Sequence, residues 1–265
     1  MNRDFDVIVV GAGHAGIEAA LACARSGLRT LMTTLDVNTI GKMSCNPAIG
    51  GIAKGQVVRE VDALGGEMGR CIDRTGIQYK MLNQSKGPAV HSPRAQADRE
   101  AYQKDMQRVC EAQENLALMS TTVDDYLIRE GAIEGAIVAT GEEISARAVI
   151  VCTGTFLGAK LHYGMNDVPG GRAGEMPAQK LSDTYKRLGF QVNRQKTGTC
   201  PRLHKDTIDY DALVEQPGDD RPRPFSYSTP IDGFNPNKAM CWLTYTNERT
   251  HEIIKANLDR SPMFT

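Results

Sequence analysis

The residues with the clearest chemical potential lie near the start of the chain, where Gly11, Gly13 and Gly16 form a G-x-G-x-x-G motif. An apolar run over 5–10 precedes them and a helical pattern over 15–26 follows, so the motif joins a predicted buried strand to a predicted helix. The first glycine permits a tight turn, the second lets the backbone approach a pyrophosphate, and the third lets helix and strand pack closely. The N–H groups at the helix start then face an anion. The sequence therefore predicts a dinucleotide site.

A second chemical candidate is Cys45, which lies in a glycine-rich loop over 38–55 that is too long for a plain connector. Cysteine is a nucleophile as its thiolate, which nearby cations and helix N-termini stabilise. Lys42, Lys54 and the helix start near Lys54 are the expected sources of that stabilisation. Two interpretations stay open: Cys45 reacts, or it only lines the cofactor pocket.

His14 lies inside the predicted phosphate loop, where a role in loop shape and helix capping is favoured over acid–base chemistry. Many dinucleotide sites also carry an acid at the end of the second strand, where it holds a ribose hydroxyl. That strand is predicted over 29–34, and the expected position is occupied by Thr34. Asp36 is the nearest substitute for the missing acid.

The elements that must position these residues alternate between helices and strands, which predicts an α/β fold. Helices are expected over 15–26, 56–64, 94–114 and 176–188, and a small β-meander is expected over 116–151. The final strand, from residue 148, runs into Thr153 and Gly154, a small turn that brings backbone against a ligand at the carboxyl edge of the sheet. From residue 191 proline-rich stretches alternate with short apolar pieces, which indicates the start of an inserted second domain.

Composition narrows the class of protein. The 265 residues are 41% hydrophobic, without an apolar run near the ~20 residues of a membrane helix. The short acidic start does not resemble a signal peptide, and seven cysteines without a CxxC pair argue against a metal site or a disulfide framework. A cytoplasmic location is expected. The net charge of −1 gives no overall sign of nucleic-acid binding, although 54–108 holds ten Lys/Arg against seven Asp/Glu. A solvated helix surface is favoured there over a phosphate-binding face.

Seven short motifs occur in one order and are together far more specific than any one of them. They are GAGHAG at 11–16, MSCNPAIGG at 43–51, DALGG at 62–66, SKGPAV at 85–90, RAQADR at 94–99, GGRAG at 170–174 and NLDRSPM at 257–263. In this combination the chain resembles the glucose-inhibited division protein A family, the FAD subunit of the bacterial tRNA uridine-5-carboxymethylaminomethyl modification enzymes. The resemblance covers essentially the whole chain and implies that it is the N-terminal part of such a protein.

The resemblance implies a flavoprotein of the two-dinucleotide-binding type. It gives a Rossmann-like FAD-binding domain at 1–190 and the start of an inserted NAD-binding or substrate domain at 191–265. The family's loop cysteine matches Cys45 as the catalytic residue, and its adenine-side backbone contact matches Val123. With the residues above, the expected cofactor contacts are Gly11, Ala12, Gly13, His14, Ala15, Gly16, Asp36, Asn46, Gly50, Gly51, Val123, Thr153 and Gly154.

The implied activity is addition of a carboxymethylaminomethyl or aminomethyl group to C5 of the wobble uridine of certain tRNAs. The implied cofactors are FAD, NADH as reductant and 5,10-methylenetetrahydrofolate as one-carbon donor. The implied partner is a GTPase, with a homodimer of the FAD subunit forming a heterotetramer with it. Alternatives are a folate- and FAD-dependent tRNA uracil methyltransferase, another FAD oxidoreductase, or a truncated nucleotide-binding module without turnover.

Overall fold

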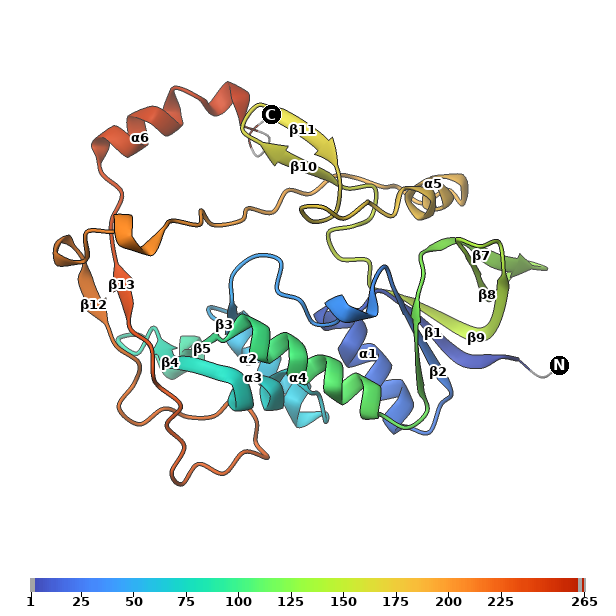
Figure 1. Ribbon diagram of the computed structural model, residues 1–265, viewed down its shortest axis with the longest axis horizontal. Coiled ribbons are helices and arrows are strands. Elements are labelled where there is room, and N and C mark those ends of the chain that lie inside the picture. The colour runs from blue at the N-terminus through green and yellow to red at the C-terminus, as the bar shows by residue number, and fades with distance from the viewer. Residues whose placement is uncertain (1–2, 262–263, 265) are drawn as a thin grey trace.

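The computed structural model describes residues 3–261 and 264. The first two strands of the chain belong to a six-stranded sheet (Figure 1). Its strands, in spatial order, are β6 (Leu116–Ser120), β2 (Thr30–Thr34), β1 (Phe5–Val10), β9 (Glu143–Val151), β8 (Ala132–Val138) and β7 (Val123–Arg129). The first four are parallel, and β8 and β7 continue the sheet as an antiparallel meander. The α/β class and the meander are therefore confirmed.

Strand β1 is buried on both faces, which explains its uninterrupted apolar sequence. Val7 and Val9 pack in one cluster with the helices α1 (His14–Arg25) and α4 (Arg99–Ala112). Ile8 and Val10 point the other way, into a cluster that includes residues of the meander and of α5 (Gln179–Arg187). The glycine motif thus follows a strand fixed between two layers.

A smaller antiparallel sheet lies beside the first, in the order β3-β5-β4 (Figure 1). Its strands are β3 (Ala48–Gly50), β5 (Ser92–Ala97) and β4 (Gly76–Leu82), and its helices are α2 (Lys54–Ala63) and α3 (Met68–Thr75). Two expectations were wrong here: the glycine-rich loop contains a strand, and residues 94–97 belong to β5. The predicted helix begins only after Asp98, whose carboxylate accepts hydrogen bonds from the amides of Glu100 and Ala101. Pairing with β4 and a strong N-cap overrode the local helical pattern.

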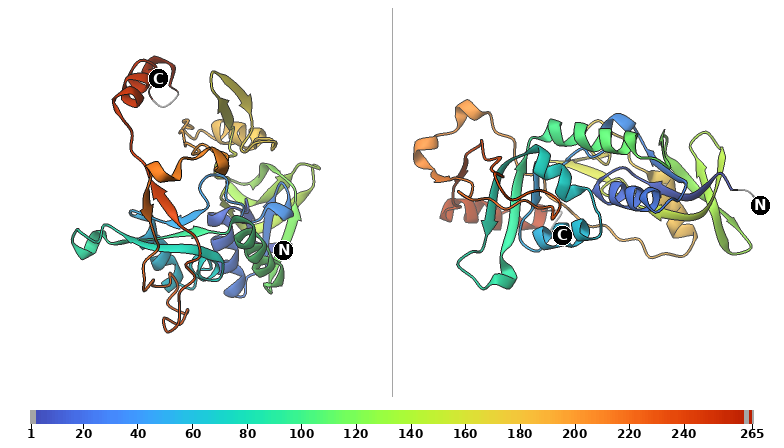
Figure 2. Two further views of the ribbon diagram at one scale, coloured as in Figure 1. Left: turned by 60° about the vertical axis from the view of Figure 1, so that its left-hand side comes forward. Right: turned by 90° about the horizontal axis from the view of Figure 1, so that it is seen from below.

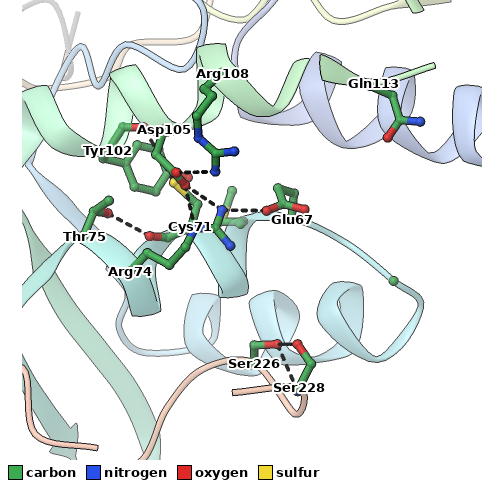
Figure 3. Close-up of polar contacts among 12 residues, drawn as sticks. Glu67, Cys71, Arg74, Thr75, Tyr102, Asp105, Arg108, Gln113, Ser226 and Ser228 are labelled. Carbon is green, nitrogen blue, oxygen red and sulfur yellow. Dashed lines mark hydrogen bonds and ion pairs between the residues drawn. The ribbon is translucent and has the colours of Figure 1, made fainter. Parts of the chain in front are cut away.

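An ion-pair network joins the helices α1, α3 and α4. Glu67, with only 4% of its side chain exposed, accepts from Arg25 of α1 and from Arg74 of α3, each at 2.7 Å. Arg74 also pairs with Asp105 of α4, which pairs with Arg108 (Figure 3). A carboxylate this buried needs such partners, so the network fixes how α1, α3 and α4 pack.

The later chain forms smaller elements that project from the layered body (Figures 1 and 2). They are the hairpin of β10 (Lys160–Tyr163) and β11 (Asn166–Pro169), the pair β12 (Val214–Gln216) and β13 (Cys241–Leu243), and α6 (Glu248–Lys255). Short 3-10 helices lie at Val37–Thr39 (η1), Pro88–Val90 (η2), Lys205–Thr207 (η3), Tyr210–Ala212 (η4) and Leu258–Arg260 (η5). Pro262 and Met263 of the last sequence motif lie outside the described residues.

One later segment returns to the body. Between β12 and β13 the chain passes along β4, where the amide of Asp219 donates a hydrogen bond to the carbonyl oxygen of Tyr79. Further along the same segment, Phe225 is fully buried in the main core. The expected division at residue 190 stays a prediction. Across the part of the chain that the structure describes, none of the helices has the length and apolar character needed to span a membrane.

Candidate active site

The carboxyl ends of β1 and β9 lie side by side, with Val10 opposite Val151. In the sheet, β2 and then β6 lie on one side of β1, and β9 lies on its other side. The connections that follow β1 and β9 therefore leave this edge of the sheet in opposite directions, which makes it a topological switch point. Ligands of open α/β sheets bind at such switch points. A cavity of about 380 Å³ opens there, within the ~300–1,000 Å³ typical of ligand pockets.

The three motif glycines have different surroundings. Gly11 has φ of +105°, and a Cβ on it would lie 2.3 Å from the carbonyl oxygen of Cys152. A Cβ on Gly16 would lie 1.8 Å from the carbonyl oxygen of Gly11, whereas a Cβ on Gly13 would meet nothing within 4 Å. Gly11 and Gly16 thus serve close packing, while the space beside Gly13 is open. No side chain caps α1, which begins at the pocket-lining residue His14, so the amides of its first turn are available to bind an anion.

His14 lines the pocket with its ring against Tyr102, the two centroids 5.6 Å apart. Burial lowers the pKa of the imidazole below its ordinary 6.5, so the ring is neutral near pH 7. The Nε2 atom is buried without a hydrogen-bond partner among the described residues. This environment fits loop shaping better than proton transfer.

Most of the expected cofactor contacts meet at this cavity. Those in its lining are Gly11, Ala12, Gly13, His14, Asn46, Val123, Thr153 and Gly154, together with Cys45. Those outside the lining are Ala15, Gly16, Asp36, Gly50 and Gly51.

Two of the residues outside the cavity lining, Asp36 and Gly50, have structural roles. The exposed Asp36 carboxylate accepts from the amide and the side chain of Asn38, both at 2.9 Å, and so caps η1. A Cβ on Gly50 would lie 2.7 Å from the Phe225 ring. At the end of β2 it is Thr34, not Asp36, that reaches the cavity lining.

The cations beside the cysteine loop differ from those expected. Lys42 lines the cavity but pairs with Glu175 at 3.3 Å, and Lys54 is exposed and outside the lining. Arg172 pairs with Glu175 at 2.7 Å and donates to the Ser44 hydroxyl at 3.2 Å. Arg172 lowers the pKa of Glu175, which keeps this carboxylate charged. Arg172 lies in the GGRAG motif and Glu175 directly follows it, but spacing gave the motif no chemical meaning.

A second contact to the loop comes from much later in the chain. Arg202 donates to the carbonyl oxygen of Cys45, and the Cys45 thiol donates to the carbonyl oxygen of Gly198 at 3.2 Å. The Cys200 thiol donates to Asn46 Oδ1 at 2.8 Å. No local pattern in the sequence connects Cys200 or Arg202 to residue 45, so neither contact is predictable from the sequence.

Known proteins resemble this chain over nearly its whole length. The family model described as glucose inhibited division protein A matches residues 6–265. The chain belongs to the glucose inhibited division protein A family. Similar relatives are the tRNA uridine 5-carboxymethylaminomethyl modification enzymes MnmG of Thermodesulfovibrio yellowstonii, 52% identical over 264 residues, and of Aquifex aeolicus, 53% identical over 266 residues. The matches cover 100% and 98% of this chain but 42% and 43% of those relatives.

Solved structures agree with this assignment to the GidA family. The Aquifex aeolicus GidA structure in the form I crystal is 52% identical, with a TM-score of 0.93, covering 100% of this chain and 45% of that one. A GidA-related protein from Thermus thermophilus, 22% identical with a TM-score of 0.53 over 72% of this chain and 71% of that one, shares the fold. The chain spans about two fifths of the length of the curated relatives it matches.

A larger cavity of about 840 Å³ lies at the opposite, amino-terminal edge of β1, lined by charged residues such as Asp6 and Arg29. These charges are largely paired with one another, including Arg29 with Asp6 and Arg129 with Glu143. In this GidA-family chain the smaller cavity, beside the glycine loop, is therefore the better candidate for chemistry.

Several cations of 54–108 are engaged by other parts of the chain. Arg74 belongs to the helix network, Lys80 pairs with Asp219 at 3.8 Å, and Arg94 donates to Gln216. Lys86 is exposed, and its ammonium has no partner among the described residues. The choice between a solvated helix surface and a phosphate-binding face in this segment stays a prediction.

Proposed function

We propose that this chain provides the FAD site and the reactive cysteine loop of an enzyme that adds a carboxymethylaminomethyl or aminomethyl group to C5 of the wobble uridine of certain tRNAs. One observation carries the proposal: a single cavity brings together the glycine loop, the Thr153–Gly154 turn and Cys45 in a GidA-family chain. Relatives about 52% identical are named for this uridine modification. Because the chain spans about two fifths of their length, the activity is proposed for the protein as a whole.

The residues at the cavity fit FAD. The first amides of α1 and the open space at Gly13 would hold the pyrophosphate, and the backbone at Val123 would meet the adenine side. Thr34 is placed better than Asp36 to meet a ribose hydroxyl. When bound, FAD would supply the redox chemistry, with NADH as reductant and 5,10-methylenetetrahydrofolate as one-carbon donor.

In this reaction Cys45 would act as the nucleophile, through its thiolate. Uracil C5 is a weak nucleophile until a thiolate adds at C6, which forms a C–S bond and moves the ring electron pair toward C5 and the C4 oxygen. After C5 has bonded to the one-carbon unit, loss of the C5 proton restores the ring and expels the thiolate. The hydrogen bonds from Arg172 to Ser44 and from Arg202 to the Cys45 carbonyl would hold the loop in place for this step.

The further components of the proposed system follow the family resemblance. The substrate is tRNA and the partner is a GTPase, with a homodimer of the FAD subunit joining it in a heterotetramer. The proposed compartment is the cytoplasm, where tRNA is modified.

The test is a Cys45→Ser variant of the full-length protein in a deletion strain. Serine keeps the size of the side chain but is a far weaker nucleophile at neutral pH, so bound flavin should remain while the modified wobble nucleoside disappears from tRNA. Cys241→Ser is the matched control, because Cys241 is half-buried in β13 and lies outside the cavity lining. Near-normal modified nucleoside in the Cys45→Ser strain would reduce Cys45 to a lining residue.

A further inference from the structure

Two cysteines meet at the rim of the proposed cofactor cavity. The sulfur of Cys200 lies 2.8 Å from Asn46 Oδ1, and the sulfur of Cys45 lies 3.8 Å from the same oxygen atom. Cys45 is half-buried and Cys200 is exposed, so a small oxidant can reach the pair. One amide side chain therefore brings together two thiols from distant parts of the sequence.

Arg202 fastens the two segments to each other. One guanidinium nitrogen donates to the carbonyl oxygen of Cys45, and another lies 3.0 Å from the Cys200 sulfur. Residues 42–47 and 190–204, all described in the structure, form neither helix nor strand. Small backbone adjustments on both sides can therefore bring the sulfurs to bonding distance, which regular elements would resist.

The other cysteines near the main core are poor alternatives. Burial raises the pKa of the Cys110 thiol to about 12 and raises that of Cys71 further. Burial also raises the pKa of Cys152, the second cysteine that lines the cavity. Disulfide formation needs an attacking thiolate and access to the oxidant, so burial disfavours these three.

We propose that Cys45 and Cys200 form a reversible disulfide at the rim of the cavity. With hydrogen peroxide as oxidant, one cysteine thiolate attacks a peroxide oxygen, the O–O bond breaks, and a sulfenic acid and water result. The second thiol attacks the sulfenic sulfur, the S–S bond forms and a second water leaves, so two thiols lose two electrons and two protons to one peroxide. A dithiol reductant reverses the change. The bond ties residues 198–202 over the loop and removes the Cys45 thiol, whatever reaction that thiol performs.

The experiment uses the full-length protein, reduced, desalted, exposed to hydrogen peroxide and then blocked with N-ethylmaleimide. Digestion without reduction and mass spectrometry should give a peptide pair that contains Cys45 and Cys200, and dithiothreitol should abolish it. Cys45→Ser and Cys200→Ser should each eliminate the pair, while Cys241→Ser should retain it.

The protein without cysteine substitutions gives the result that would overturn the proposal. If peroxide leaves Cys45 as a dimedone-reactive sulfenic acid, or links it to Cys152 or any cysteine other than Cys200, the assignment is wrong. Because this readout is covalent, it does not depend on tRNA modification, and its failure is distinguishable from failure of the proposed function.

Discussion

Gly13 and Gly16 stand in the same loop, yet a methyl group added to each would meet different surroundings. Gly13 has φ of −77° and open space, so Gly13→Ala should keep the fold while its methyl group occupies the space proposed for the pyrophosphate. Gly16→Ala places a carbon 1.8 Å from the Gly11 carbonyl oxygen and should destabilise the protein by ~1–3 kcal/mol. Flavin absorbance and thermal melting of both variants separate the two effects. Full flavin content in Gly13→Ala would contradict the assigned phosphate loop.

His14 gives a pH prediction at the same scale. Its pKa in the folded protein is lowered by burial from 6.5, so the unfolded chain binds the proton more readily. Stability from this residue is therefore complete above pH 6.5 and is lost as pH falls, with a slope of at most ~1.4 kcal/mol per pH unit. Urea unfolding between about pH 5 and pH 8 should show a shallower acid loss in His14→Gln than in the parent protein. His251→Gln is the control, because His251 is exposed. Equal slopes of unfolding free energy against pH for the parent protein and His14→Gln would refute the prediction.

Among the elements, α3 anchors a segment far away in the sequence. The Asp73 carboxylate accepts from the amide of Phe225 at 2.8 Å and from the amide of Ser226 at 2.9 Å. Asp73→Ala leaves both buried donors without this acceptor and should lower the free energy of unfolding by ~1–3 kcal/mol, with faster proteolysis between β12 and β13. Asp183→Ala is the control, because Asp183 is an exposed partner of Lys186. Unchanged proteolysis in Asp73→Ala would show that core packing of Phe225 holds the segment alone.

The same scale shows what sequence could and could not predict. The strand, glycine loop and α1 are adjacent in the chain, so local spacing was enough to predict them. The local pattern predicts helix for residues 94–97, which belong to β5, because the partner strand β4 is not visible in a local pattern. Arg172, Cys200 and Arg202 reach the Cys45 loop only through the fold, and no sequence period links them to it.

At the scale of the whole molecule, several cations of 54–108 are engaged by other parts of the protein, which limits their availability to the phosphates of the proposed tRNA substrate. Lys80 and Arg94 are engaged with the segment at 216–219, whereas Lys86 is exposed and free among the described residues. Lys86→Ala should weaken tRNA binding equally across tRNA sequences and reduce the slope of log affinity against log salt by about one or less. Lys186→Ala removes a cation already paired with Asp183 and serves as control. Identical slopes for Lys86→Ala and the parent would assign Lys86 to the ordinary solvated surface.

The position of β1 between β2 and β9 also has a consequence for synthesis of the protein. β2 follows β1 almost at once, but β9 comes only at Glu143–Val151, after β2, β6 and the whole second sheet have been made. At ~5–20 residues per second, the ribosome delivers β9 on the order of ten seconds after β1. During that time one side of the central strand has unpaired N–H and C=O groups, which favour pairing with other chains. The nascent protein must therefore be kept apart from its neighbours until β9 arrives, and only then can the switch point between β1 and β9 form.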